Sequence, residues 1–359
     1  MKKDSEETES SRREIRVLAY GVGAIGSQIV RLLLRKKGLK IVGAIDASPK
    51  KIGKDLGEVI GMKTPLGVVV SKDSERLLSS VDVDVAIHAT SSFLKDVYPQ
   101  LIHLIEHGVN VVSTCEELSY PYVTDASLAS NLDALAKKHG VTVLGTGINP
   151  GFLMDTLPIA LSGVCQEVKS IRVERVIDAA KRRLPFQKKI GAGLTPEEFK
   201  DMMEKKKITG HVGLEQSIAM IADALGLNLR KIEVEPVKPV IAEKPMESRE
   251  IKVDVGKVAG LTQSAYGLVD GKPFVTLIFK AYIGAEEEYD SITIEGTPSI
   301  NQKIAPCIHG DLATAAIIVN SIPKVINATP GLKTMKDLPV PSAFINDIKQ
   351  YLKGTKAPK

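Results

Sequence analysis

Hydrophobic and polar positions alternate with two different periods along the first 150 residues of the chain. Short runs rich in β-branched residues predict buried strands, and windows in which apolar residues recur every three or four positions predict amphipathic helices. The predicted strands cover Glu14–Ala19, Lys40–Ile45, Gly67–Val70, Val83–Ala89, Val109–Ser113 and Val141–Leu144. The predicted helices between them cover Gly23–Lys37, Ser74–Ser80, Ser92–His107 and Asp125–Lys138. Strands that alternate with helices predict an α/β domain with a Rossmann-type, doubly wound parallel sheet.

The pattern changes after Gly151. Long alternating strands between Glu247 and Glu295, with a hairpin turn at Asp270-Gly271, predict an α+β domain with a mostly antiparallel open sheet. Before them the pattern predicts a helix at Phe152–Leu161, a strand at Val168–Ile177, a basic loop at Lys181–Leu194, and helices at Pro196–Lys206 and Gly213–Leu225. A last helix is predicted at Gly310–Ile322, followed by a proline-rich tail.

These patterns divide the chain into four parts. Residues 1–13 are charged and are expected to form a solvated tail, since they lack the apolar segment of a signal peptide. Residues 14–150 are the predicted dinucleotide-binding domain, and residues 151–305 the predicted substrate and dimerisation domain. We expect residues 306–359 to pack back near the first domain.

Composition narrows the class of protein. The 359 residues are 43% hydrophobic, and no run approaches the length of a membrane span. A net charge of +5, with 4% aromatic residues and no Trp, does not favour binding to nucleic acid. Three cysteines cannot all pair and none stands in a CxxC spacing, so we expect a cytoplasmic protein without a metal site.

Three glycines follow the first predicted strand, in the stretch AYGVGAIGSQIV. A GxGxxG spacing between a strand and a helix is typical of dinucleotide-binding folds. There the first glycine permits a tight turn, the second lets the backbone approach the pyrophosphate, and the third allows the helix to pack closely on the strand. The helix N-terminus then favours the phosphates. The predicted contacts are Gly21, Gly23, Ala24, Ile25 and Gly26.

An acidic residue is expected about 20 residues after the last glycine, where it accepts the ribose hydroxyls. Asp46 has this position, at the end of the second predicted strand. Its charge favours NAD over NADP because it repels a 2′-phosphate. Ser48, Lys50 and Lys51 follow at once, however, and are able to hold that phosphate. The sequence therefore predicts a cofactor that is NAD or NADP.

The ends of the later strands extend the predicted cofactor site, because ligands of a doubly wound sheet lie outside the carboxyl ends of its strands. The predicted contacts are Ala89, Thr90 and Ser91 after one strand, Thr114 after the next, and Asn149 in the turn after the last. His88 lies inside an apolar strand, and we interpret it as a core histidine with satisfied hydrogen bonds.

Two adjacent carboxylates, Glu116 and Glu117, follow the fifth predicted strand, beside the expected nicotinamide. Burial at such an edge raises the pKa of a carboxyl group toward the range useful for general acid–base catalysis. The alternative is that both are helix-start or surface acids, and position alone does not decide between the two interpretations. Cys115 has no histidine nearby in the sequence and is not expected to be a nucleophile.

Longer segments resemble one enzyme family over nearly the whole chain. They are STCEELSYP, GTGINPGFLMDTLP, RVIDAAKRRLPFQKKIGAGLTPEEF, GHVGLEQSIAMIADALG and HGDLATAAIIVNSIPKVINATPGLKTMKDLP. They are similar to 2,4-diaminopentanoate dehydrogenases and related NAD(P)-dependent amine dehydrogenases, and the N-terminal half resembles the dinucleotide domain of dihydrodipicolinate reductases. The His-His pair expected of those reductases is missing, because the six histidines are never adjacent.

The resemblance implies an oxidative deamination in which the C4 amine of 2,4-diaminopentanoate becomes a ketone and ammonia is released. In that family the acid of the TCEE-type motif is the catalytic candidate, which here is Glu116, with Glu117 as the alternative. The substrate carboxylate needs a cation, and the basic segment KRRLPFQKK is the expected source. The predicted substrate contacts are Asp178, Arg182, Arg183, Gln187, Lys188 and His211.

Two other functions stay open at this point. One is an amine dehydrogenase that accepts a broader range of amines and ketones, and the other is a nucleotide-sensing protein without catalysis. The paired glutamates and the basic loop argue against a sensor, which needs neither. The long strands of the open sheet are suited to pairing two subunits, so we expect a homodimer that acts on a small amine or amino acid.

Overall fold

The computed structural model describes residues 13–353, which form two compact units. The first unit comprises the described parts of Met1–Ile148 and Asp311–Lys359, and the second is Asn149–Gly310. The predicted solvated tail, residues 1–13, lies outside the described residues apart from Arg13. Within residues 13–353, no helix has both the length and the apolar character needed to cross a membrane.

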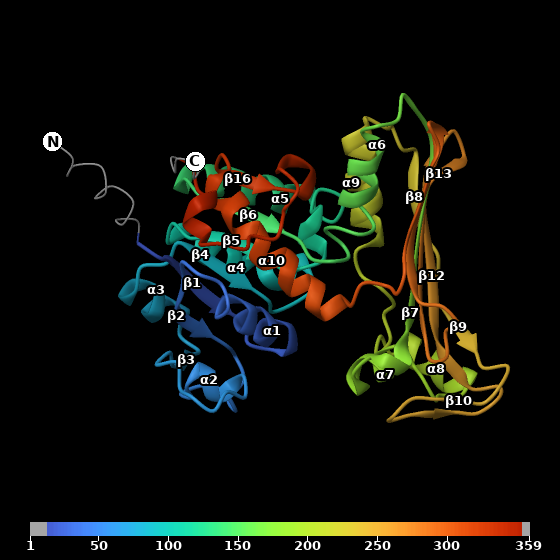
Figure 1. The fold of residues 1–359 in the computed structure, drawn as a ribbon, viewed down its shortest axis with the longest axis horizontal. Helices are drawn as coiled ribbons and strands as arrows, with labels where there is room; N and C mark the ends of the chain where they lie inside the picture. The colour runs from blue at the N-terminus through green and yellow to red at the C-terminus, as the bar shows by residue number, and fades with distance from the viewer. Residues whose placement is uncertain (1–12, 354–359) are drawn as a thin grey trace. The chain divides into compact units, whose positions relative to one another are not determined.

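The first unit is built on a seven-stranded sheet in the order β16-β6-β5-β4-β1-β2-β3, in which every neighbouring pair is parallel (Figure 1). The strands are β1 (Ile15–Tyr20), β2 (Leu39–Ile45), β3 (Val70–Ser71), β4 (Val85–His88), β5 (Asn110–Ser113), β6 (Thr142–Gly145) and β16 (Gly331–Lys333). The helices are α1 (Ala24–Leu33), α2 (Leu56–Val59), α3 (Ser74–Ser80), α4 (Leu94–Glu106), α5 (Ala126–His139) and α10 (Gly310–Asn327). The predicted doubly wound parallel sheet is confirmed.

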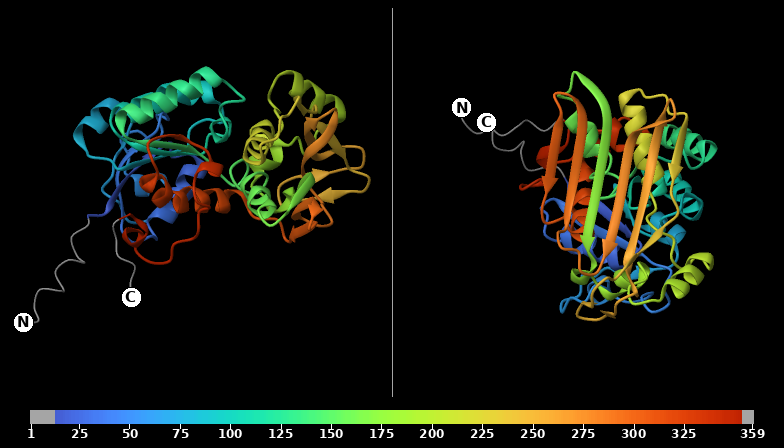
Figure 2. Two further views of the ribbon diagram at one scale, coloured as in Figure 1. Left: turned by 90° about the horizontal axis from the view of Figure 1, so that it is seen from above. Right: turned by 90° about the vertical axis from the view of Figure 1, so that its right-hand side faces the viewer.

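Helices cover both faces of this sheet. Figures 1 and 2 show α3, α4 and α5 on one face and α1 and α10 on the other. The first face buries a large aliphatic cluster that includes Leu78 of α3, Leu101 of α4 and Leu132 of α5. The cluster on the second face includes Val30 of α1 and Leu56 of α2. Because both faces are buried, the strands are continuous apolar runs rather than alternating ones.

The carboxyl ends of the central strands lie level with one another. Tyr20 at the end of β1 pairs with His88 at the end of β4, and His88 pairs with Ser113 at the end of β5. Gly21, Ala89 and Thr114, which come directly after these three residues, therefore leave the sheet side by side at one edge. This register brings the predicted cofactor and catalytic segments of the first unit together.

The second unit is built on a mixed sheet in the order β15-β14-β7-β13-β12-β8, with β9 also paired to β12. Its pairs are antiparallel except β7 with β13, so the predicted mostly antiparallel sheet is confirmed. The strands are β7 (Glu167–Asp178), β8 (Lys231–Val234), β9 (Lys238–Ile241), β12 (Val258–Val269), β13 (Lys272–Tyr282), β14 (Tyr289–Thr297) and β15 (Ile300–Ile304), and β10 (Met246–Glu247) pairs with β11 (Lys252–Val253) in a separate hairpin. The helices are α6 (Thr156–Ser162), α7 (Leu184–Lys189), α8 (Pro196–Glu204) and α9 (Leu214–Leu225).

The helices of the second unit lie on one face of its sheet, and the other face is bare of helices in the right-hand view of Figure 2. Ala265 and Leu277, which pair across β12 and β13, are fully buried on the covered face. Their neighbours Tyr266 and Thr276 also pair with each other and are half-buried on the open face. The predicted turn at Asp270-Gly271 closes the hairpin between β12 and β13, and its residues have φ of 50° and 77°.

Some predicted boundaries are wrong for physical reasons. The predicted loop Lys181–Leu194 contains α7, which is too short to produce a helical period and begins with a proline in its first turn. The last helix does not end before Pro323 but runs through it to Asn327, and Pro323 is one of its buried residues. Helix α1 ends at Leu33 instead of Lys37, since none of residues 34–37 is buried.

Candidate active site

The glycine loop after β1 has the stereochemistry that its spacing predicts. Gly21 has φ of +92°, and a Cβ there would lie 2.3 Å from the carbonyl oxygen of Ala89. A Cβ on Gly26 would lie 1.9 Å from the carbonyl oxygen of Gly21, so the start of α1 packs directly on the loop. At Gly23, by contrast, a Cβ would meet no atom of the described residues within 4 Å. The middle glycine therefore leaves its backbone open to a ligand.

Helix α1 begins at this open position. Gly23 is its N-cap residue and has no side chain to cap the helix. The first turn, which includes Ala24 and Ile25, is free of acidic residues. Uncapped N–H groups and the positive end of the helix dipole form an anion-binding site. These features fit the pyrophosphate of a dinucleotide.

Asp46 follows β2 and is held by three donors. Its carboxylate accepts hydrogen bonds from the N–H groups of Val22 and Ser48, each at 2.8 Å, and from the Lys51 ammonium at 2.8 Å. Burial by itself would raise the pKa of Asp46, but the Lys51 ammonium and the two N–H groups outweigh it and lower the pKa below its usual value. Asp46 is therefore ionised at neutral pH and fixed beside the glycine loop.

Ala89, Thr90 and Ser91 follow β4 and bond to neighbouring elements. The Ala89 N–H donates to the carbonyl of Tyr20 at 2.8 Å. The Thr90 hydroxyl donates to Gln100 at 2.8 Å, and the Ser91 hydroxyl donates to Asp96 at 2.7 Å, so both side chains are tied to α4. On the next strand, the Thr114 N–H donates to the carbonyl of His88 at 2.9 Å.

His88 is fully buried, and both of its ring nitrogens have partners. Nδ1 lies 2.9 Å from the Ser113 hydroxyl and Nε2 lies 2.7 Å from the Gln100 amide oxygen. Burial lowers the pKa of His88 to about 4, so the ring is neutral at pH 7. The interpretation of His88 as a satisfied core histidine is confirmed.

The two glutamates after β5 differ in their surroundings. The Glu117 carboxylate accepts the N–H of Leu94 at 2.6 Å, and so caps α4, whose N-cap residue Phe93 provides no side-chain acceptor. Glu116 is half-buried and begins the 3₁₀ turn Glu117–Ser119. Burial raises the pKa of Cys115 to about 12, so its thiol is protonated and unsuited to nucleophilic chemistry.

The basic segment of the second unit is partly neutralised by one carboxylate. Glu288 lies 3.0 Å from the Lys181 ammonium and 3.5 Å from the Arg182 guanidinium. Burial acts to raise the pKa of Glu288, but these cations outweigh it and lower the pKa. Arg183 and Lys188 of the same segment are exposed to solvent. The segment thus pairs Lys181 and Arg182 with one carboxylate, and it presents Arg183 and Lys188 to solvent.

Gln187 and Asp178 have structural partners. The buried Gln187 amide donates to the Arg182 carbonyl at 2.7 Å and accepts from the Ser248 hydroxyl at 2.7 Å, which ties α7 to the turn after β10. Asp178, at the end of β7, accepts the N–H of Ala180 at 3.1 Å. It also lies 3.7 Å from the Lys181 ammonium.

His211 and Asn149 carry polar atoms that are buried without a partner among residues 13–353, namely Nε2 of His211 and Oδ1 of Asn149. The His211 ring stacks on Phe279, with ring centroids 4.6 Å apart. Burial, helped by the positive charges of Lys189 and Arg175, lowers the pKa of His211 to about 3. His211 is therefore neutral at physiological pH, and its ring can donate or accept a hydrogen bond but carries no charge.

Sequence reasoning missed two buried polar centres of the second unit. Arg175 of β7 bonds to Asp290 and to the carbonyl of Ile308, each at 2.6 Å. Asp155 accepts from the N–H of Gly151 and from the Ser217 hydroxyl, each at 2.8 Å. Arg175 could have been found from the period of β7, since it stands at an inward position between two buried aliphatic residues. No local pattern marks Asp155.

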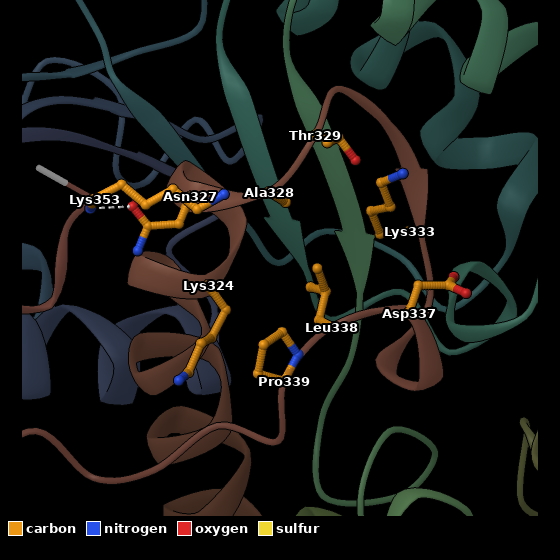
Figure 3. A pocket seen from close by; sticks show the side chains of 9 residues that line it. All are labelled: Lys324, Asn327, Ala328, Thr329, Lys333, Asp337, Leu338, Pro339 and Lys353. Carbon is orange, nitrogen blue, oxygen red and sulfur yellow. Dashed lines mark hydrogen bonds between the residues drawn. The ribbon is translucent and has the colours of Figure 1, made fainter.

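A cavity of about 290 Å³ lies in the first unit, beside β16 and the end of α10. Three strands separate β16 from β1, so this cavity is apart from the glycine loop. It is lined by Lys324, Asn327, Ala328, Thr329, Lys333, Asp337, Leu338, Pro339 and Lys353 (Figure 3). The ammonium groups of Lys324 and Lys333 point in opposite directions in Figure 3 and do not converge on one point. We assign no step of a reaction to this cavity.

Two family models match the chain in succession. Residues 15–119 match the N-terminus of dihydrodipicolinate reductase, and residues 152–354 match the 2,4-diaminopentanoate dehydrogenase C-terminal domain. The second match covers more than half of the chain.

Individual proteins are similar over almost the full length. A 2,4-diaminopentanoate dehydrogenase of Acetoanaerobium sticklandii is 35% identical over 346 residues, which cover 94% of this chain and 97% of the relative. An amine dehydrogenase of Streptomyces virginiae is 23% identical over 92% of this chain and 98% of its own. The solved structure of an amine dehydrogenase from Mycobacterium smegmatis has a TM-score of 0.80 and 31% identity, and covers 93% of this chain and 98% of its own.

Proposed function

The chain belongs to the 2,4-diaminopentanoate dehydrogenase family of NAD(P)-dependent amine dehydrogenases, and we propose that it catalyses the oxidative deamination of 2,4-diaminopentanoate. The products are 2-amino-4-oxopentanoate and ammonia, and the reverse reaction is a reductive amination. The observation that supports this proposal is that Glu116 follows β5 at the same edge of the sheet as the glycine loop. The chain is also similar to a 2,4-diaminopentanoate dehydrogenase over 94% of its length.

We propose that the cofactor is held by residues 14–150, which include Asn149. Gly23 and the start of α1 bind the pyrophosphate, and Asp46 accepts the ribose hydroxyls. Thr90, Ser91 and Thr114 complete the site at the ends of β4 and β5. When bound, the nicotinamide accepts a hydride from the carbon that carries the amine. Asp46 favours NAD, whereas Lys51 and Ser48 supply donors for the additional phosphate of NADP.

Glu116 is the proposed general base. Hydride can leave only when the amine nitrogen is neutral, so a carboxylate must first take a proton from the substrate ammonium. The acid formed in this way releases its proton to solvent, and the regenerated carboxylate takes a proton from the water that adds to the iminium carbon. It passes that proton to the nitrogen, which leaves as ammonia, and in the reverse direction the same group returns these protons. Glu117 is the weaker candidate because its carboxylate already caps α4.

We propose that residues 151–305 bind the substrate. Its carboxylate needs a bidentate cation, and the basic segment of residues 181–189 is the source. Arg183 and Lys188 are its exposed cations, whereas Arg182 and Gln187 shape the segment through their bonds to Glu288 and Ser248. Asp178 is suited to the α-amine of the substrate and His211, being neutral, to a hydrogen bond.

The experiment that tests this function compares three proteins: the wild type, Glu116→Gln and Glu117→Gln. Each is given NAD or NADP with 2,4-diaminopentanoate, and formation of the reduced nicotinamide is followed by its absorbance. We expect Glu116→Gln to lower kcat by about 10²- to 10⁴-fold, the usual contribution of a general base, with cofactor affinity unchanged. Glu117→Gln keeps an oxygen to accept the N–H of Leu94 and serves as the matched control.

Retained turnover in Glu116→Gln, with loss in Glu117→Gln, would move the catalytic role to the second acid. A protein that ignores 2,4-diaminopentanoate but reduces the cofactor with other amines would refute the proposed substrate. That outcome has a specific basis, because two of the similar proteins are amine dehydrogenases without a narrower substrate in their names.

A further inference from the structure

Two histidines at the C-terminal end of α4, of which His107 is the C-cap residue, and one glutamate on α3 form a cluster outside the candidate active site. His103 and His107 are four residues apart and lie on the same side of α4, as this helical spacing requires. Glu75 lies in the first turn of α3. One ligand atom from each of the three side chains lies within 4.8 Å of the other two. The side chains are 23%, 24% and 68% exposed, so the cluster is open to solvent on one side.

The distances within the cluster are too long for hydrogen bonds. Nδ1 of His103 is 3.7 Å from Oε2 of Glu75, and Nε2 of His107 is 3.6 Å from Oε1 of Glu75. An N–H···O hydrogen bond is about 2.7–3.2 Å long. A tetrahedral ion with bonds of about 2.0–2.1 Å separates its ligand atoms by about 3.3 Å. The observed spacing is therefore nearer to that of atoms sharing an ion than to that of a hydrogen-bonded pair.

The His107 ring is already oriented as a ligand. Its Nδ1 lies 2.9 Å from the carbonyl oxygen of His103, and a carbonyl can only accept, so Nδ1 carries the proton. This leaves a lone pair on Nε2, which faces Glu75. Metal-bound histidines commonly donate their other N–H to a carbonyl or carboxylate in this way, because the bond fixes both the tautomer and the ring orientation.

The second ring of the cluster belongs to His103. Its Nε2 is buried and has no hydrogen-bond partner anywhere in the described part of the chain. The ring is packed edge-on against His107, with centroids 4.6 Å apart. The orphaned Nε2 is not the atom that faces Glu75, so it is not the missing ligand position; that atom is Nδ1, 3.7 Å from the Glu75 carboxylate. An ion on Nδ1 would leave the proton on Nε2 and would fix the plane of the ring.

We propose that Glu75, His103 and His107 bind one divalent ion of the Zn²⁺ type, with solvent in the remaining position. Imidazole and carboxylate ligands suit Zn²⁺ and Co²⁺ better than Mg²⁺ or Ca²⁺, which prefer oxygen alone. The ion joins α3 to α4 across one face of the sheet. The site lies about 14 Å or more along α4 from Leu94, the residue that Glu117 caps, so it stabilises the first unit rather than taking part in hydride transfer.

The test uses untagged full-length protein that has been treated with a chelator and then passed through a desalting column. Zn²⁺ is titrated by calorimetry into the wild type, His107→Gln, Glu75→Gln and His139→Gln. His139 lies on α5 outside the cluster and serves as the matched control. We expect one Zn²⁺ per chain in the wild type and His139→Gln, and affinity at least tenfold weaker in the other two. Zn²⁺ should raise the Tm of only the proteins that bind it.

A second measurement does not depend on the stability of the variants. Co²⁺ added to the wild type should give the visible absorption bands of a four-coordinate ion with nitrogen ligands, and His107→Gln should lack them. Stoichiometric Zn²⁺ binding that persists in both His107→Gln and Glu75→Gln would overturn the proposal, as would a wild type that binds no Zn²⁺. None of these measurements involves amine oxidation. The ion-binding proposal can therefore be refuted while the proposed function holds, and the proposed function can be refuted while the ion-binding proposal holds.

Discussion

Gly23 and Gly26 are three residues apart and differ completely in what surrounds their Cα atoms. A methyl group on Gly26 would collide with a backbone carbonyl, which cannot move aside, whereas a methyl group on Gly23 would enter open space. Gly23 also has φ of −77° and ψ of −161°, a conformation that alanine adopts without strain. The two glycines therefore separate the requirements of folding from those of cofactor binding.

We predict opposite effects for alanine at these two positions. Gly26→Ala should destabilise the protein by about 1–3 kcal/mol, the usual result of forcing atoms into a packed site. Gly23→Ala should leave the Tm unchanged and weaken NAD(P) binding by at least tenfold, because its methyl group occupies the space for the pyrophosphate. Thermal unfolding and calorimetric titration of the cofactor measure the two effects. A Gly23→Ala protein that binds cofactor normally would show that the phosphates lie elsewhere.

His88 makes stability depend on pH. Burial keeps the ring neutral and outweighs the hydrogen bond to Gln100, which acts to raise the pKa, so that the pKa is about 4 against 6.5 for an ordinary histidine. As the pH falls from 6.5 toward 4, the unfolded chain gains a proton that the folded chain does not. The contribution of His88 to the free energy of unfolding should therefore be fully present above pH 6.5. It should fall by about 3 kcal/mol as the pH is lowered from 6.5 to 4.

Chemical denaturation of the wild type and His88→Gln across this pH range measures the effect. The variant should be less stable at neutral pH but lose less stability on acidification, because it no longer has the titrating group. His211, whose pKa is about 3, contributes with the same sign in both proteins and so cancels in the comparison. If the free energy of unfolding fell equally with pH in the two proteins, His88 would not be held neutral in the folded state.

Residues of the site were predictable to different degrees. Gly21, Gly23 and Gly26 could be assigned individually because a fixed backbone conformation leaves a fixed spacing in the sequence. The sequence favours Glu116 over Glu117, and this stays a prediction. The contact that distinguishes the two acids, the hydrogen bond of Glu117 to the start of α4, could not be predicted because its partner Leu94 is distant in the chain. Asp155 and Asp290 could not be found because their partners are distant in the chain.

At the scale of elements, α4 depends on a residue from outside its own sequence. Its N-cap residue is Phe93, which has no polar side chain, and the carboxylate of Glu117 accepts the N–H of Leu94 instead. A negative charge at this end also interacts favourably with the helix dipole. The segment after β5 therefore positions α4, which in turn holds Thr90 through Gln100 and Ser91 through Asp96.

We predict that Glu117→Ala lowers the free energy of unfolding by about 1 kcal/mol, the usual cost of losing a helix cap. Glu117→Gln retains an acceptor and should lose less than half of that amount, since only the charge is removed. Denaturant unfolding of the two variants beside the wild type gives the comparison. An equal loss in both would mean that the charge, and not the hydrogen bond, stabilises α4.

Most elements of the first unit could be predicted, and several of the second could not. The strands of the first unit are continuous apolar runs because helices cover both faces, and such runs are distinct from the helical windows between them. β8, β9 and β16 were missed because they are short and carry charged or exposed residues, so alternation is hardly visible. Their strand conformation comes from pairing with β12 and β6, which a local pattern does not contain.

At the scale of the molecule, the second unit has one face of its sheet without helices (Figure 2). Thr276 lies near the middle of that face and pairs with Arg172 of β7 on one side and Tyr266 of β12 on the other. Ile278, two residues further along β13 on the same face, is only 9% exposed. A broad surface of this mixed character is suited to an interface between two copies of the chain.

We therefore predict a homodimer that pairs through the open face of the β7, β12, β13 and β14 strands. Thr276→Arg places a charge near the centre of that face and should convert the dimer to a monomer in sedimentation velocity, because an unpaired buried charge costs several kcal/mol in an interface. Ser130→Arg, on the exposed side of α5 in the first unit, is the matched control and should remain a dimer. A wild type that sediments as a monomer, or a Thr276→Arg protein that stays dimeric, would place the subunit contact elsewhere or exclude it. If the prediction holds, the bare face is explained by the assembly rather than by the fold of one chain, since a single subunit would otherwise expose Tyr266 and its neighbours to water.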